Sequence, residues 1–434
     1  MVRGMDSASL RQILGLAVPA LPVLAAEPLY LLVDTAVVGH LGGVELGALG
    51  IGAVVLAQLS TQLTFLSYGT TARAARLHGA GRRADAVAEG VQATWLAIGL
   101  GLLLVGIGQV VAGPVARALA GSGAVADAAE GWLRIAVLGV PMVLITLAGN
   151  GWMRGVQDTR RPLGFVLAGN GVSLVLCPTF VHGLDWGLDG SAVANVIGQS
   201  IAAVLFLVAL RGHARAPRPR VIWAQLKLGR DFILRSLAMQ ACFLSAAAVA
   251  ARTSVGAVGA HQVVLQLWTF LALVLDSLAI AAQALVGAAL GAGQAKRARD
   301  LSGQFARYGL VFGIALGIVF AGLSHVLPRV FTMDPVVLSE IPHAWWFFVA
   351  MQPVAGIVFA LDGVLFGAGD IAYLRTATLT SALIGFLPLI WLSLAFDWGL
   401  AGIWTGLTLF ILLRLITLLT RLRSGRWAVV GATR

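Results

Sequence analysis

Long blocks of hydrophobic residues alternate with short polar stretches along the whole chain. Blocks such as 92–112 and 310–327 are continuously apolar, which is typical of helices and excludes a transmembrane barrel, whose strands alternate. A bilayer core of about 30 Å requires roughly 20 residues per helix. Because lipid offers no hydrogen-bond partners, the backbone N–H and C=O groups of a span must bond to each other. The pattern predicts twelve spans, at 12–40, 46–72, 87–111, 130–153, 162–182, 190–210, 231–252, 258–288, 304–327, 341–366, 374–396 and 399–420.

Composition supports an all-α integral membrane protein. Of 434 residues, 59% are hydrophobic and 11% are charged, whereas soluble domains are nearer 45–50% and 25%. The net charge of +11 is distributed unevenly: outer connections hold only Arg117, Arg134, Arg252 and Arg329, with Arg414 ambiguous. This positive-inside bias predicts cytoplasmic termini in a cell inner membrane. It indicates membrane lipid, and not nucleic acid, as the partner of the basic residues.

The sequence contains no recognisable catalytic, metal-binding or nucleotide-binding motif. Cys177 and Cys242 both fall inside predicted spans, so neither a disulfide nor a metal site is expected. There is no phosphate-binding loop or catalytic triad, and we expect no cofactor. An intramembrane enzyme would need paired acids, but Asp185 and Asp397 occupy equivalent positions of a repeat. We therefore predict that the chain is not an enzyme.

The chain contains an internal duplication with a constant offset of 212 residues. Residues 151–158 resemble 363–370, residues 185–190 resemble 397–402, and the same offset relates Gln92 to Gln304. Each half holds six spans, so both halves insert in the same orientation. They are predicted to be related by a pseudo-two-fold axis along the membrane normal, as in parallel-repeat transporters.

The duplication also defines the expected domains. Residues 1–212 form an N-terminal lobe with helices 1–6, and residues 231–434 form a C-terminal lobe with helices 7–12. Residues 213–230 are basic and contain prolines, so we predict that they form a cytoplasmic linker. Two lobes of this kind can rock around a central cavity.

A polar face on the first span is the strongest functional candidate. Glu27, Tyr30 and Asp34 are spaced i, i+3 and i+7, which places them on one side of a helix. A carboxylate inside a span costs roughly 2.5–3.5 kcal/mol on insertion scales and is a functional candidate by default. We predict that Asp34 binds and releases a proton, and that Glu27 assists. The alternative is a structural carboxylate bonded to a neighbouring helix.

Other polar residues inside the predicted spans are candidates for a cavity wall. Asn170, Ser173 and Cys177 share one face and, with the first helix, are predicted to line one polar pocket. The alternative is that each bonds a neighbouring helix. Asp362 aligns with Asn150 at the repeat offset. The full set of cavity candidates is Tyr30, Gln58, Gln62, Asn150, Asn170, Ser173, Cys177, Asn195, Asp276 and Asp362.

The first span resembles that of the multidrug and toxic compound extrusion (MATE) transporters, especially their DNA-damage-inducible-protein-F-like branch. The resemblance rests on Pro28-Leu-Tyr30-Leu-Leu-Val-Asp34-Thr35-Ala-Val-Val-Gly39-His-Leu-Gly42, on Ala-Ala-Gln283-Ala-Leu-Val-Gly287, on Arg154-Gly155 with Asp158-Thr159-Arg160, and on Asp362-Gly363 with Gly367-Ala-Gly-Asp370. It implies twelve helices in two lobes, and export of amphipathic, often cationic compounds in exchange for H⁺ or Na⁺.

The resemblance also assigns roles to residues. It implies that Asp34 responds to the coupling ion and that Tyr30 and Asn150 line the same cavity. Ser173 and Cys177 stand where the family has Asn and Asp, and Asn195 stands where it has Thr. This departure removes a carboxylate and disfavours Na⁺, which prefers several hard oxygen ligands.

The sequence thus predicts a monomeric antiporter that exports amphipathic, cationic organic compounds in exchange for inward H⁺. Na⁺-coupled drug efflux stays open as an alternative. So does a flippase for lipid-linked precursors, although the few Arg or Lys residues in the predicted spans count against an anionic headgroup.

Overall fold

The computed structural model describes residues 8–213 and 215–432, and all regular elements in those ranges are helices. Short 3₁₀ or π turns lie at Val137–Gly139, Thr179–Gly183 and Ala382–Phe386. The helices of the first half are α1 (Leu10–Gly39), α2 (Gly43–Leu63), α3 (Phe65–Gly79), α4 (Arg83–Ala120), α5 (Ala124–Ala136), α6 (Val140–Gly155), α7 (Arg160–Pro178) and α8 (Gly187–Ala209). Those of the second half are α9 (Pro219–Thr253), α10 (Val255–Gly291), α11 (Ala295–Gly322), α12 (Leu327–Phe331), α13 (Pro335–Gly367), α14 (Ile371–Ser381), α15 (Leu387–Ala395) and α16 (Gly399–Arg423).

The prediction of twelve spans is confirmed. Twelve helical segments of the described chain are long and apolar enough to cross a membrane. Several of them combine two helices, such as Gly43–Gly79 and Ala124–Gly155. α1 continues as one helix through Pro19, Pro22 and Pro28, each of which removes a backbone donor and favours bending.

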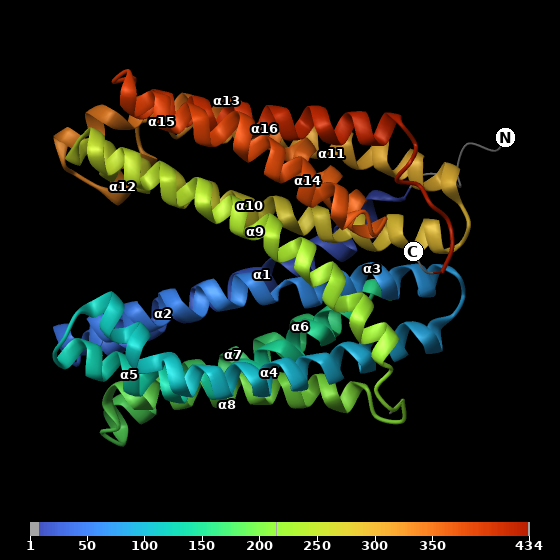
Figure 1. Ribbon diagram of the computed structural model, residues 1–434, viewed down its shortest axis with the longest axis horizontal. Coiled ribbons are helices and arrows are strands. Elements are labelled where there is room, and N and C mark those ends of the chain that lie inside the picture. Colours follow the sequence, from blue (N-terminus) through green and yellow to red (C-terminus); the bar gives the residue numbers. More distant parts are fainter. Residues whose placement is uncertain (1–7, 214, 433–434) are drawn as a thin grey trace. The chain divides into compact units, whose positions relative to one another are not determined.

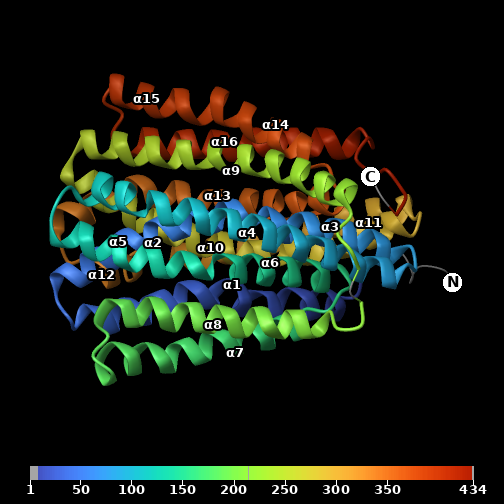
Figure 2. The same ribbon diagram turned by 60° about the horizontal axis from the view of Figure 1, so that its bottom comes forward.

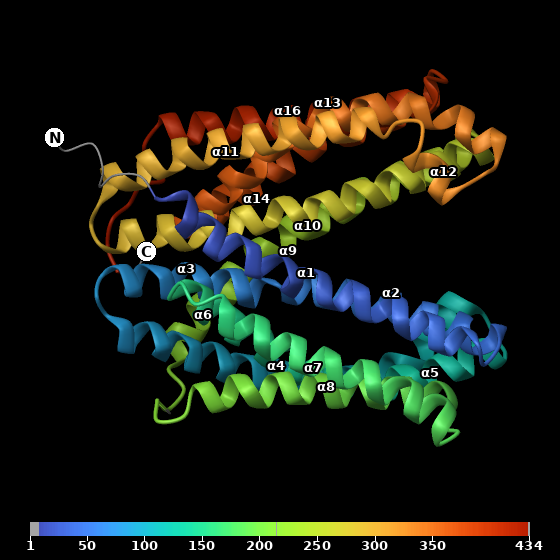
Figure 3. The same ribbon diagram turned by 180° about the vertical axis from the view of Figure 1, so that it is seen from behind.

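The chain divides into two compact units. One consists of Val18–Gly229, and the other of Arg230–Arg434 together with the described residues before Val18. In the first unit α3 packs on α4 and α6, and α7 lies beside α8 (Figures 1 and 2). In the second unit α10 and α11 both pack on α13, as Figure 3 shows from behind.

The connector predicted at 213–230 is helical from Pro219 onward. Proline suits the first turn of a helix because its missing N–H would be unpaired there in any case. This opening of α9 packs on α3: a Cβ added at Gly229 would lie 2.7 Å from the Phe65 ring. The opening of α9 therefore belongs to the first unit, and the opening of α1 belongs to the second.

Two repeat-equivalent glutamines hold these opening segments. The Ala8 N–H donates to Oε1 of Gln304 at 3.0 Å, and Nε2 of Gln304 donates to the Ala8 carbonyl at 2.7 Å. Nε2 of Gln92 likewise donates to the Ala216 carbonyl at 3.0 Å, and its Oε1 accepts from the Arg218 N–H at 2.5 Å. Each glutamine fixes the chain just before the first helix of one half.

The backbone repeats the 212-residue offset found in the sequence. Positive φ angles occur at Gly81 and Gly293, and at Asp185 and Asp397, with values of 74° and 77° and of 56° and 52°. Further pairs at this offset are Gln157 with Gly369 and Gly187 with Gly399. Turns in the left-handed region are costly for residues other than glycine, so their recurrence in register identifies the two halves as copies of one structural unit.

Candidate functional site

A buried stripe on α1 positions the principal carboxylate. Ala26, Tyr30, Asp34 and Val38 are all buried, and their spacing of four residues keeps them on one helix face. Asp34 is only 1% exposed. Glu27, one position beyond Ala26, is exposed. The predicted face is therefore divided, with Tyr30 and Asp34 packed inside the first unit and Glu27 beside them at an open surface.

Asp34 receives hydrogen bonds from two neutral donors. Sγ of Cys177 on α7 donates to Oδ1 at 3.2 Å, and Oγ of Ser191 on α8 donates to Oδ2 at 3.2 Å. Within the described chain, no Lys, Arg or His forms an ion pair with this carboxylate. A buried carboxylate without a cation can shed its charge only by taking up a proton, so this arrangement suits proton exchange.

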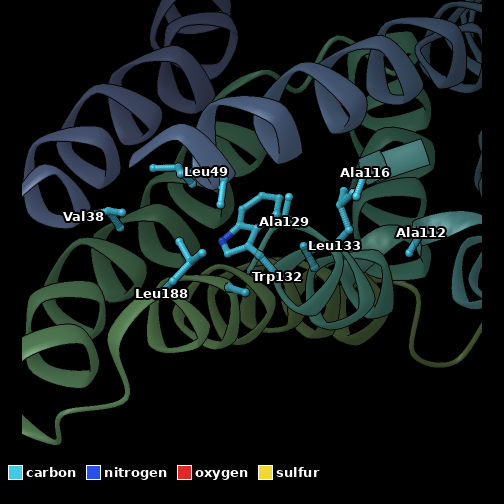
Figure 4. Close-up of a cluster of buried hydrophobic side chains, with 11 residues drawn as sticks. Val38, Leu49, Ala112, Ala116, Ala129, Trp132, Leu133 and Leu188 are labelled. Atoms are coloured by element: carbon cyan, nitrogen blue, oxygen red, sulfur yellow. The ribbon is translucent and has the colours of Figure 1, made fainter. Parts of the chain in front are cut away.

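A tryptophan continues the network behind Ser191. Nε1 of Trp132 on α5 donates to Oγ of Ser191 at 3.2 Å. Trp132 is the largest member of a cluster that also contains Val38, Leu49, Leu133 and Leu188, and Figure 4 shows its ring among these side chains. Neither Ser191 nor Trp132 is among the residues predicted from the sequence. The requirement that a buried indole N–H find an acceptor was the one available indication.

Several predicted cavity residues carry buried polar atoms without a partner among the described residues. These atoms are Oη of Tyr30, Oε1 of Gln62 and Oδ1 of Asn150. Tyr30 lies one turn from Asp34, and Asn150 belongs to α6. Unpaired buried polar groups are uncommon in proteins, so these atoms have spare capacity for water or a ligand.

Glu27 lines a pocket in the first unit. The polar members of its wall are Glu27, Ser60, Asn195 and Gln199, and the apolar members include Leu59 and Val143. The residues come from α1, α2, α6 and α8, with the α5–α6 junction completing the wall. No basic side chain of the described chain is paired with Glu27. The pocket thus combines one carboxylate and hydrogen-bonding groups with leucine and valine surface.

The three candidates on α7 have different hydrogen-bond partners. Cys177 reaches Asp34, but Oγ of Ser173 donates to the Ala194 carbonyl at 3.0 Å and Nδ2 of Asn170 bonds the Val166 carbonyl of its own helix at 3.0 Å. Residues 170 and 177 share a face but lie about 10 Å apart along the axis. Ser173 instead joins α7 to α8, and Gln58 on α2 is exposed and takes no part in the Glu27 pocket.

The second unit holds its buried carboxylate differently. Asp362 on α13 accepts hydrogen bonds from Nη2 of Arg414 at 2.5 and 2.6 Å, and from Nη2 of Arg235 at 2.8 Å. Arg414 is 2% exposed. Arg235 lies on α9 and Arg414 on α16, so the few basic residues inside the spans include two that pair with one buried carboxylate. Asp276 is half-buried on α10.

Neither carboxylate belongs to a recognisable metal centre. Across residues 8–213 and 215–432, no group of three or more His, Cys, Asp or Glu side chains is arranged to hold a metal ion. The polar groups of the first unit are suited to binding a proton and hydrogen-bonding a small organic molecule.

Comparison with known proteins identifies the class. A profile of the MatE family matches residues 19–179 and matches again at 232–391, which confirms the duplication. Among solved structures, one described as MATE in the bent conformation has a TM-score of 0.88 at 18% identity and covers 96% of this chain and 95% of its own. The chain belongs to the MatE family of MATE transporters and is a multi-pass membrane protein.

Two curated relatives illustrate the breadth of the family. The chain is 32% identical to the chloroplastic protein DETOXIFICATION 44 of Arabidopsis thaliana over 438 residues, covering 96% of this chain and 84% of the relative. It is 30% identical to DNA damage-inducible protein F of Escherichia coli strain K12 over 433 residues, covering 94% and 92%. The resemblance predicted from the first span is confirmed.

Proposed function

We propose that this MATE transporter exports amphipathic, cationic organic compounds in exchange for inward H⁺, and that Asp34 is the group that carries the proton. The observation behind this proposal is the surroundings of Asp34, which is buried and, among the residues that the structure describes, accepts hydrogen bonds only from the neutral groups of Cys177 and Ser191. Asp362, by contrast, is already neutralised by Arg414 and Arg235.

The chemistry around Asp34 favours H⁺ over Na⁺. Na⁺ prefers several hard oxygen ligands, and a thiol is a poor substitute for one. Of the two hydrogen bonds that the Asp34 carboxylate accepts in the described part of the chain, one comes from the thiol of Cys177. A proton needs only the carboxylate itself. Exchange of one H⁺ for one monovalent cation moves no net charge, so the pH difference alone drives it, and one pH unit is worth about 1.4 kcal/mol, which sustains a gradient of roughly tenfold.

The Glu27 pocket supports the choice of substrate. A ligand cation would be attracted by the Glu27 carboxylate, while Asn195 and Gln199 offer hydrogen bonds and the leucine and valine walls accept an apolar body. Few polar groups placed among apolar walls are typical of small-molecule sites, which occupy about 300–1,000 Å³. This pocket has a volume of about 40 Å³, so it would have to widen to admit an organic cation. Tyr30 and Asn150, with unpaired polar atoms, would bond the substrate or the water that accompanies the proton.

The positive-inside distribution of Lys and Arg supports an orientation with both termini in the cytoplasm. We further propose an inner-membrane location and a monomeric state, with lipid as the surrounding partner. Protons then enter from the outer face, and substrate leaves in the opposite direction. Labelling of single cysteines placed beyond α16 in intact and permeabilised cells would test the orientation.

The test uses the full chain in liposomes with tetraphenylphosphonium as the probe. We expect an imposed pH gradient to drive transport of the probe, and a Na⁺ gradient at equal pH to drive none. Asp34→Asn should abolish gradient-driven transport. Asp127→Asn, which changes an exposed aspartate of the same unit, should transport at the unmodified rate. Transport by Asp34→Asn at the unmodified rate would sink the proposal, and drive by Na⁺ alone would replace its coupling ion.

A further inference from the structure

The direction of one hydrogen bond at Asp34 is fixed by chemistry. A serine hydroxyl has a single hydrogen to donate, and an indole N–H can only donate. Since Nε1 of Trp132 points at Oγ of Ser191, this oxygen is the acceptor in that bond. The Ser191 hydrogen is then available to Oδ2 of Asp34, 3.2 Å away.

Ser191 departs from the usual behaviour of hydroxyl residues in helices. Such residues commonly donate back to the carbonyl four positions earlier, and in this chain Ser200 bonds Val196 and Thr179 bonds Val175 in this way. Ser191, which is fully buried, donates to another helix instead. Its bond to Asp34 is therefore a specific arrangement that needs an external cause.

Packing around Trp132 provides that cause. Its ring lies against Gly52 on α2, where an added Cβ would be 2.3 Å from ring atom Cε3. Val38, one turn after Asp34, and Leu188 and Ala192, which flank Ser191, belong to the same cluster (Figure 4). Close-packed side chains have little freedom to shift, so the indole N–H is held in place against the Ser191 hydroxyl.

We infer that Ser191 and Trp132 are positioning residues for Asp34: the Trp132 indole orients the Ser191 hydroxyl, which in turn stabilises the Asp34 carboxylate and sets the pH at which it gives up its proton. This inference rests on the proposed coupling role of Asp34. The titratable groups that face Asp34 are Tyr30 on α1 and Cys177 on α7, while α8 and α5 contribute the neutral Ser191 and Trp132.

The test is the pH profile of transport in liposomes, measured as initial rate against pH at a constant pH difference. A hydrogen bond to the charged form of an acid favours that form. Removing it in Ser191→Ala makes Asp34 hold its proton to higher pH, so the midpoint of the profile should rise by about one pH unit. Ser191→Thr keeps the hydroxyl and should restore the original midpoint.

Trp132→Phe tests the second link and leaves no buried donor unpaired. The Ser191 hydroxyl then becomes free to bond its own helix, so the midpoint should move in the same direction as in Ser191→Ala, by a smaller amount. Trp345→Phe is the matched control. Trp345 is equally buried, at 1% exposure, and its indole N–H donates to the Phe320 carbonyl at 3.2 Å. It should leave the midpoint unchanged.

Two results would overturn the inference. One is an unshifted midpoint in Ser191→Ala or, if that variant does not fold, in Trp132→Phe, whatever happens to the maximal rate. The other is an equal shift in Trp345→Phe. Neither result touches the proposed function, which fails only if Asp34→Asn keeps its coupling or if Na⁺ drives transport. The two failures are therefore distinguishable.

Discussion

The two halves of this transporter each bury a carboxylate, but they surround it with opposite chemistry. Asp34 in the first half is bonded by a thiol and a hydroxyl, whereas Asp362 in the second is bonded by two guanidinium groups. Breaking a buried ion pair leaves an uncompensated charge. Asp362 is thus held by two cations in a structural ion pair, while the hydrogen-bond partners of Asp34 carry no charge.

The 212-residue offset sharpens this comparison, since neither constellation has a counterpart in the other half. The positions equivalent to Asp34, Cys177 and Ser191 hold Ala246, Leu389 and Ile403. Those equivalent to Arg414 and Arg235 hold Ala202 and Val23. The duplication preserved helices, turns and the equivalent glutamines Gln92 and Gln304, but not the buried carboxylates or their partners.

The largest expected effect concerns the ion pair. Arg414→Leu leaves the buried Asp362 with Arg235 alone and should lower the free energy of unfolding by about 3 kcal/mol. Thermal unfolding in detergent measures it. Arg252→Leu, at an exposed arginine stacked on Trp391 at 5.6 Å, should change stability by less than about 1 kcal/mol. Equal losses in the two variants would show that burial of the pair does not matter.

The next effect tests the packing of the Asp34 side. Gly52→Ala places a methyl group against the Trp132 ring and should cost about 1–3 kcal/mol. Gly50→Ala is the control on the same helix, because a Cβ there meets nothing within 4 Å. It should be neutral or slightly stabilising. A Gly52→Ala protein as stable as Gly50→Ala would contradict the close packing of Trp132.

A smaller effect tests whether the scaffold is shared by the halves. Gln92→Leu and Gln304→Leu each remove two hydrogen bonds to an opening segment, each bond worth about 1 kcal/mol. Amide hydrogen exchange should accelerate before α9 in the first variant and at the start of α1 in the second, by similar factors. If amide exchange accelerated in only one of the two variants, the two glutamines would not play equivalent roles.

The smallest effect concerns Cys177. A thiol is a weak donor, so Cys177→Ala should raise the pH midpoint of transport by about half a unit, less than Ser191→Ala. Cys177→Ser supplies a stronger donor and should lower the midpoint. A larger shift for Cys177→Ala than for Ser191→Ala would reverse the ranking of the two bonds.

The fold was predictable because the features that determine it, the hydrophobic segments and the repeat, each extend over many residues. Hydrophobic length defines the spans, and a duplicated register repeats at residues such as Asp185 and Asp397. The connector was less predictable, since Pro219 suggested a break in the chain and in fact begins α9. The sequence also did not show which basic side chains are buried inside a helix bundle. Arg235 lies close in sequence to the basic connector, yet its side chain reaches Asp362.

The site was predictable only where a charge or a spacing drew attention to it. Asp34 stands out as an acid within an apolar span, and Cys177 stands out because the family resemblance implies an acid at its position. Ser191 has neither mark, and Trp132 looks like any core aromatic. Their roles depend on the rotation of α5 and α8, which apolar periodicity defines too coarsely to orient a single hydroxyl.

The most direct test of the account is proton release on substrate binding. Purified protein in weakly buffered detergent solution is mixed with tetraphenylphosphonium while a pH indicator records released protons. The account predicts release of up to one proton per protein by the unmodified chain and by Asp127→Asn, and none by Asp34→Asn although the probe still binds. Undiminished proton release by Asp34→Asn would contradict the claim that the coupling chemistry lies in the first half.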